Sequence, residues 1–364
     1  MEPITHFLTG ACIGRAGLNR KTAYATLAAV LAAEAADLDV LWGFAGPVAE
    51  LQHHRGVTHT FLGAPVVAAV VVGAVWIVHR LGKNRPRKKP APVGVHWGWL
   101  YLAALVAALS HILLDWANNY GVRPFFPFSP RWYAGSFLFI AEPILWALFF
   151  LAFFMPWLLG LVGGEIGARR KPFRGRGWAI FALAGTVALG CWRWAERAQA
   201  MAMLANTRVA SEPVSRVALE PYPVNPYRWH AILETRDFYQ TAEIGTWNAG
   251  GLDSIVSDPK TDVIYKPADT PAVEAARRTY LGRVYLDWGT WAVVRDLGPQ
   301  PIPGLAPPQL PLPRTWTTVE FGDLRFDYPF LPTMTRGRAP LSGWVYIVDG
   351  REEAGQFFNG SPQK

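Results

Sequence analysis

The chain has 364 residues, of which 51% are hydrophobic and 17% are charged, and its formal net charge is +8. These averages combine two unlike parts, because long apolar runs fill the chain to about residue 196 while Pro, Tyr, Trp and charged residues are frequent after it. The clearest basic clusters, at 83–89 and 169–176, lie between apolar runs, as the positive-inside rule expects, so the charge does not indicate a nucleic-acid partner.

The first part of the chain reads as a helical membrane bundle. Residues 3–17 predict a short N-terminal helix that is too short for a comfortable span, since crossing takes roughly 20 residues of helix. Longer apolar runs predict about five spanning helices, over residues 22–44, 60–81, 97–116, 137–161 and 178–195.

The second part reads as a small β-rich domain. A helical extension at 195–208 is followed by segments that alternate apolar and polar residues and favour β-branched and aromatic types. These predicted strand segments are 229–244, 283–297, 315–328 and 342–358, and a Pro-rich linker covers 301–313. We therefore expect a transmembrane domain at 1–196 and a β-rich extracytoplasmic domain at 197–364.

The positive-inside rule places both basic loops in the cytoplasm. The last span then exits, so that residues 197–364 of this multi-pass membrane protein are expected on the extracytoplasmic side. The same assignment brings a set of polar residues within the apolar half to the outer boundary: His6, Asp37, Asp39, the HHRGVTH motif at 53–59, His111, Asp115 and Glu142.

His111 and Asp115 are the first candidates for chemistry, since ionisable side chains inside a bilayer are costly and usually face a polar interior. Four residues apart on a helix, they project from one face. They could share a metal, or Asp115 could orient His111; a hydrogen bond that only stabilises helix packing is the alternative.

The HHRGVTH motif strengthens the metal interpretation over a simple polar loop. It places His53, His54 and His59 within seven residues, and Gly56 permits close backbone approach. Arg55 supplies a cation suited to a phosphate or a developing oxyanion, which makes it a candidate catalytic residue.

Other polar residues complete the candidate site. Asp37 and Asp39 do not share a helical face, so the helix should unwind there or the two should serve different metals. Glu142 is a candidate general base or an interhelical hydrogen-bond partner. Candidates for substrate binding are His53, Asn118, Asn119 and Arg123, although the last three could instead cap a helix.

A mixed set of imidazoles and carboxylates suits zinc, manganese or iron, and we favour zinc. The donors exceed the four that one zinc ion needs, so a two-ion site is also open. The sequence contains no HExxH, GxSxG or P-loop motif, which removes the main support for metalloprotease, serine-hydrolase and NTPase functions.

Four motifs carry a family resemblance: THFLTG, ADLD at 36–39, HRGVTHT at 54–60 and HILLDWANNYG at 111–121. In this order they resemble the membrane-bound, LexA-regulated metal-dependent hydrolases of bacterial inner membranes, over about residues 1–200. PYPVNPYRWH at 221–230 is similar to the tail domain of some members. The resemblance implies divalent-metal hydrolysis with the ligands His6, Asp37, Asp39, His54, His59, His111 and Asp115, and it leaves His53 outside the shared core.

These patterns together predict a metal-dependent hydrolase that acts on an ester or phosphoester of a membrane lipid or lipid-linked molecule at the outer boundary. Arg55 would stabilise the developing negative charge, and the C-terminal domain would cover or present the substrate. The alternative is a non-enzymatic membrane protein, either a metal transporter or a scaffold with a structural polar cluster. A transporter should carry its ligands near the midplane, often with internal repeats.

Overall fold

A computed structural model describes residues 1–82, 93–165, 173–205, 207–247, 262–302, 305, 307–308, 314–332 and 339–363. The chain forms two compact units, and each unit is built from separate segments of the sequence. The first contains Met1–Leu38, Arg55–Glu196 and Pro221–Pro226, and the second contains Asp39–His54, Arg197–Glu220 and Tyr227–Lys364.

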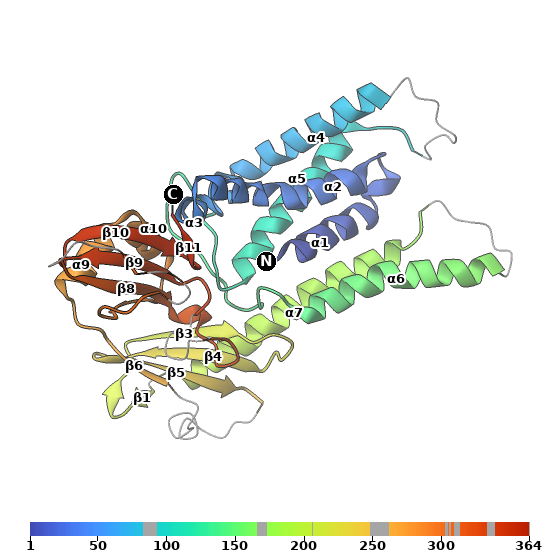
Figure 1. Ribbon diagram of the computed structural model, residues 1–364. Helices are drawn as coiled ribbons and strands as arrows, with labels where there is room; N and C mark the ends of the chain where they lie inside the picture. Colours follow the sequence, from blue (N-terminus) through green and yellow to red (C-terminus); the bar gives the residue numbers. More distant parts are fainter. Residues whose placement is uncertain are drawn as a thin grey trace. The chain divides into compact units, whose positions relative to one another are not determined.

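The first unit is helical (Figure 1). Its elements are α1 (Pro3–Arg15), η1 (Leu18–Arg20), α2 (Ala25–Glu34), η3 (Val57–His59), α4 (Gly63–Gly82), α5 (Trp97–Ala117), α6 (Pro143–Glu165) and most of α7 (Arg176–Met203). Among the described residues, α4, α5, α6 and α7 are the four helices long and apolar enough to cross a membrane. They agree with four of the five predicted spans, and α1 agrees with the predicted short helix.

The predicted span 22–44 is not one α-helix. α2 ends at Glu34 and the chain continues as the 3₁₀ segment η2 (Ala35–Ala45). Ten α-helical residues rise roughly 15 Å, about half of a hydrocarbon core. The expected loss of α-helical structure around Asp37 and Asp39 is therefore present, and it shortens the helix below the length of a span.

Small residues allow α1, α2 and α5 to pack closely, and Figure 1 shows these helices side by side. Five alanines of α2 are buried, namely Ala25, Ala28, Ala29, Ala32 and Ala33. A Cβ at Gly10 would lie 2.6 Å from the Ala29 carbonyl oxygen, and one at Gly14 would lie 2.5 Å from Thr26 Cα. Close backbone approach through small residues is how helices associate in lipid, where apolar side chains gain little by leaving the solvent.

The second unit contains two main sheets, yellow and orange-red in Figure 1. One has the order β3-β4-β5-β6 and the other the order β11-β10-β9-β8-β7. The first sheet comprises β3 (Arg216–Pro221), β4 (Arg228–Glu234), β5 (Phe238–Gly245) and β6 (Asp262–Tyr265). The second comprises β7 (Ala292–Asp296), β8 (Trp316–Asp323), β9 (Gly343–Val348), β10 (Glu352–Phe358) and β11 (Ser361–Pro362).

Shorter elements complete the second unit. They are the part of η2 after Leu38, α3 (Pro47–His53), the pair β1 (Arg208–Val209) and β2 (Glu212–Pro213), α9 (Pro271–Arg278), α10 (Tyr280–Trp288) and η4 (Leu324–Phe326). α3 packs against α10 and β10, which ties the segment Asp39–His54 to this unit. A β-rich C-terminal region is thus confirmed.

One predicted strand segment, 283–297, is wrong in its first half. α10 occupies it through Trp288, and only β7 is a strand. Leu281, Val284, Tyr285 and Trp288 are all buried and follow the spacing of one helical face, while the Thr279 hydroxyl accepts from the Gly282 amide and caps the helix. This helical period outweighs the local alternation on which the strand prediction rested.

Three other predictions concern residues outside those described. The basic loop at 83–89 falls in the gap 83–92, and the first half of the loop at 169–176 falls in the gap 166–172. The linker 301–313 is described only at 301–302, 305 and 307–308. The positive-inside argument therefore stays a prediction.

The close contact between α1 and α2 predicts that two glycine substitutions differ in their effect on stability. Gly14→Ala should destabilise the protein by about 1–3 kcal/mol, because the added methyl group meets the α2 backbone. Gly73→Ala on α4, where a Cβ meets nothing within 4 Å, should be neutral or stabilising by about 0.5–1 kcal/mol. Thermal unfolding of detergent-solubilised protein measures both, and equal midpoints for the two variants would contradict the packing described.

Candidate metal centre

Four side chains of the first unit bring their donor atoms together: Asp37, His59, His111 and Asp115. One ligand atom from each lies within 4.8 Å of every other. His59 and His111 face each other with their Nε2 atoms 3.0 Å apart. Three of the four residues are buried and Asp37 is half-buried, so the cluster is shielded from solvent on most sides.

The spacing of these atoms fits a metal ion at their centre. Asp37 Oδ1 lies 3.2 Å from His59 Nε2 and 3.5 Å from His111 Nε2. Asp115 Oδ2 lies 3.3 Å from each of the same two nitrogens. Ligand bonds of roughly 2.0–2.1 Å to a tetrahedral zinc ion place donor atoms roughly 3.3–3.4 Å apart. The donor set and its separations therefore match a four-coordinate site.

The local structure explains how distant residues reach this point. His111 and Asp115 lie one turn apart on α5 and project from the same face. His59 is at the end of the short helix η3, and Asp37 is in the 3₁₀ segment that follows α2. The contacts of α2 and α4 with α5 hold these segments against the end of α5.

The imidazole of His111 is oriented by the backbone. Its Nδ1 lies 2.6 Å from the Ala33 carbonyl oxygen, which can only accept, so Nδ1 carries the proton. In the neutral ring, Nε2 is then unprotonated and directs its lone pair into the cluster. A backbone carbonyl in this position is a common outer partner of metal-binding histidines.

Asp115 is fully buried and is surrounded by groups that favour its negative charge. Arg55 Nη2 donates to its Oδ1 at 2.8 Å, and the amino group of Met1 also donates to Oδ1. His6 Nε2 lies 3.4 Å from the same oxygen. One oxygen of Asp115 is thus held by cationic or polar groups while the other faces His59 and His111.

Arg55 is itself held in place. Its Nη1 donates to the Gly121 carbonyl oxygen at 2.8 Å and to Asn118 Oδ1 at 3.3 Å, and the guanidinium lies over the Tyr120 ring at 4.6 Å. Its backbone adopts a left-handed φ of 55°, which is uncommon for a residue with a Cβ. These contacts direct the guanidinium toward Asp115; its predicted role on a substrate anion stays a prediction.

His6 lies at the edge of the cluster. It comes from the first turns of α1, is fully buried, and stacks on His111 with ring centroids 3.7 Å apart. Among the described residues neither of its ring nitrogens has a hydrogen-bond partner. Apart from the 3.4 Å contact of its Nε2 with Asp115 Oδ1, the ring is thus buried without polar contacts, and metal binding by His6 stays a prediction.

His53 and His54 of the HHRGVTH motif, and Asp39 of the DLD sequence, belong to the second unit. His54 Nδ1 pairs with Asp39 Oδ1 at 3.0 Å, and His53 stacks on Trp42 with ring centroids 4.0 Å apart. The boundary between the units falls between Leu38 and Asp39 and again between His54 and Arg55. Both motifs therefore contribute residues to both units, and metal binding by Asp39 and His54 and substrate binding by His53 stay predictions.

The predicted residues after α5 have structural contacts of their own. Asn118 Oδ1 accepts from the Tyr120 amide at 2.8 Å, as well as from Arg55. Asn119 is 1% exposed. Arg123 is also buried, with its guanidinium 4.5 Å from the centroid of Trp132.

Glu142, the predicted catalytic carboxyl, precedes α6 and accepts from the Val224 and Ile144 amides at 3.1 and 3.4 Å. Burial raises the pKa of its carboxyl, and the positive charge of Arg193 opposes that rise. These contacts join the start of α6 to residues 221–226, and a catalytic role for Glu142 stays a prediction.

Two groups at the site could not be identified from the sequence pattern. The Ala33 carbonyl acts through the backbone, which carries no residue-specific signal. Tyr120 lies in the HILLDWANNYG segment, and its position under Arg55 depends on the turn that follows α5. Arg55 and Tyr120 are far apart in the sequence, so no local pattern indicates their contact.

Comparison with known proteins identifies the helical part of the chain. The sequence model described as YdjM inner membrane protein matches residues 1–200. A curated relative, the uncharacterized protein YfhP of Bacillus subtilis, is 24% identical over 153 residues, which cover 40% of this chain and 43% of that protein. The alignment thus spans less than half of the relative. No solved structure matches the chain.

The buried contact between Arg55 and Asp115 predicts a large effect of Arg55→Gln. Removing the guanidinium leaves a buried carboxylate without its closest cation, which should cost about 3–5 kcal/mol. Arg131→Gln is the control, because Arg131 is exposed and lies over Tyr133, and surface changes usually stay within about 0.5 kcal/mol. Thermal unfolding in detergent measures both, and a midpoint for Arg55→Gln equal to that of the control would show that the contact is dispensable.

Proposed function

The chain belongs to the YdjM inner membrane protein family, and on that premise we propose that this multi-pass inner-membrane protein is a metal-dependent hydrolase. The observation that carries the proposal is the buried cluster of Asp37, His59, His111 and Asp115, whose donor atoms have the separations of a metal site. Two imidazoles and two carboxylates favour zinc over a hard cation such as magnesium.

A divalent ion in this position supplies a Lewis acid that polarises an ester or phosphoester and makes a bound water acidic near neutral pH. The protein supplies orientation and charge. The Ala33 carbonyl fixes the His111 ring, and Arg55 fixes Asp115. A set of donors that is held before substrate arrives does not need to reorganise during the reaction.

The position of the cluster favours a lipid or lipid-linked substrate. His111 and Asp115 lie in the last two turns of the candidate spanning helix α5, and His6 lies in the first turns of α1. The end of a spanning helix is where a lipid headgroup, with its ester and phosphoester bonds, meets the protein. Under the positive-inside assignment this end faces the outer side, where the C-terminal domain would also lie.

The same position weighs against a metal transporter. Transporter sites usually lie near the bilayer midplane, between broken spanning helices. Here the donors gather at one end of α5, and the α-helical part of the interrupted element, α2, is too short to be a span. Hydrolysis therefore remains the function that the geometry supports best.

Metal content gives the first test. Purified wild-type protein should carry about one zinc ion per chain, since its four donors satisfy one tetrahedral ion. His59→Ala and Asp115→Ala should lower the metal content at least roughly tenfold. His79→Ala is the matched control, because His79 lies on α4 against the Tyr24 and Trp97 rings, outside the cluster. Metal-free wild-type protein after purification without chelator and addition of zinc would refute the proposed site.

Hydrolysis gives the second test. Labelled phospholipids and other lipid-linked esters are incubated with the protein in detergent micelles, before and after chelator treatment and zinc addition. The wild type and His79→Ala should release product with zinc, and His59→Gln should be slower by more than roughly 100-fold. Zinc-loaded wild-type protein without turnover on any substrate, but with zinc uptake in proteoliposomes that His59→Gln abolishes, would favour the transporter instead.

A further inference from the structure

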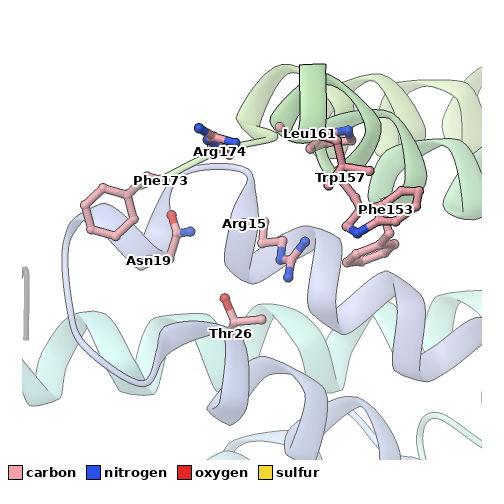
Figure 2. Close-up of a pocket in the computed structure, with 10 residues that line it drawn as sticks. Arg15, Asn19, Thr26, Phe153, Trp157, Leu161, Phe173 and Arg174 are labelled. Carbon is pink, nitrogen blue, oxygen red and sulfur yellow. The ribbon is translucent and has the colours of Figure 1, made fainter. Parts of the chain in front are cut away.

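A hollow in the helical unit lies away from the metal cluster. It has a volume of about 820 Å³ and is bordered by the end of α1, the start of α2, α6 and the chain before α7 (Figure 2). Arg15, which lines it, closes α1, whereas His6 lies in the first turns of the same helix. At roughly 1.5 Å per residue the two are about 13 Å apart along the axis. The hollow is therefore separate from the cluster.

The charged side chains that line this hollow are positive. Ten described residues line it, and they include Arg15 and Arg174 but no carboxylate. Within the described part of the chain neither arginine forms an ion pair; Arg15 instead lies over the Phe153 ring at 4.7 Å. Unpaired guanidinium groups at a half-buried site favour an anion, and their planar fork suits phosphate.

The rest of the lining is amphipathic. Figure 2 shows Asn19 and Thr26 on the side of α1 and α2, and Phe153, Trp157 and Leu161 on α6. Asn19 Oδ1 is buried and has no hydrogen-bond partner among the described residues, so it can accept from a hydroxyl or ammonium group. Trp157 and Leu161 lie near the end of the apolar part of α6, where Trp residues commonly mark the membrane–water interface.

We infer that this hollow binds the phosphate-bearing headgroup of a membrane phospholipid. Arg15 and Arg174 contact the phosphate, Asn19 accepts from the hydroxyl or ammonium group beyond it, and the rings of Phe153 and Trp157 pack against the glycerol and upper acyl chain. A free phosphate compound would make only the first of these contacts, the one between its phosphate and the two arginines. The inference concerns the end of the bundle opposite the metal cluster and does not depend on hydrolysis.

Further basic side chains surround the hollow and tie its walls together. Arg20 Nη2 donates to the Phe173 carbonyl oxygen, and Arg176 Nε donates to the Ala16 carbonyl oxygen at 2.9 Å. These bonds join the turn after α1 to the chain before α7. They hold Arg15 and Arg174 at one site, which lowers the entropy cost of binding an anion between them.

Gly160 contributes to the shape of the hollow. A Cβ at Gly160 would lie 2.4 Å from Arg174 Nη1, so the guanidinium rests directly against the α6 backbone. A larger residue at 160 would displace Arg174 and fill the hollow without changing the charge. This gives a variant that separates site shape from general electrostatic attraction.

The test is lipid retention by the full-length protein, measured by native mass spectrometry after exchange into phosphatidylglycerol, phosphatidylethanolamine or phosphatidylcholine. Wild-type protein should retain the first two better than the third, whose trimethylammonium group donates no hydrogen bond to Asn19. Arg15→Gln with Arg174→Gln should lower retention roughly fivefold per arginine removed. Gly160→Leu should lower it to a similar extent.

Arg80→Gln is the matched control, because Arg80 also lies over an aromatic ring, that of Trp76, but outside the hollow. Its retention should equal that of the wild type. Equal retention by the wild type, the double arginine variant and Gly160→Leu would overturn the inference. Displacement of bound lipid by inorganic phosphate alone, with no preference among the three lipids, would assign the hollow to free phosphate compounds and also overturn it.

Discussion

The structure depends on one buried carboxylate. Asp115 is fully buried at the end of an apolar helix, where an unpaired charge would cost several kcal/mol. Its Oδ1 is held by Arg55 and by the amino group of Met1, and its Oδ2 faces His59 and His111. The cations offset part of the cost of burial, and the arrangement leaves one oxygen directed into a set of donors that a metal ion would complete.

Packing brings those donors together. Gly10 and Gly14 let α1 approach α2, and the buried alanines of α2 let it approach α5, so the Ala33 carbonyl reaches His111. The early end of α2 then releases Asp37 from the helix and turns it toward the histidines. Small residues within the bundle and the polar cluster at its end are therefore parts of one arrangement, since the cluster forms only where the helices approach closely.

The sequence indicates those features that depend on local spacing. The four-residue separation of His111 and Asp115 predicts one helical face. The two-residue separation of Asp37 and Asp39 predicts either the loss of α-helical structure there or separate metals, and the structure has the loss. The division of HHRGVTH could not be predicted, because it depends on which unit each residue packs in: His54 pairs with Asp39, while Arg55 turns with a left-handed backbone toward Asp115. The helix α10 was missed because alternating and helical patterns overlap in a short apolar segment.

If Asp37, His59, His111 and Asp115 surround one metal ion, anomalous diffraction at the zinc absorption edge from crystals of zinc-loaded protein will locate it. We expect one strong peak at bonding distance from the Nε2 atoms of both histidines and from a carboxylate oxygen of each aspartate, roughly 2.0–2.2 Å away. A zinc-loaded crystal with no peak in the cluster, and with His59 and His111 still in direct contact through their Nε2 atoms, would contradict it.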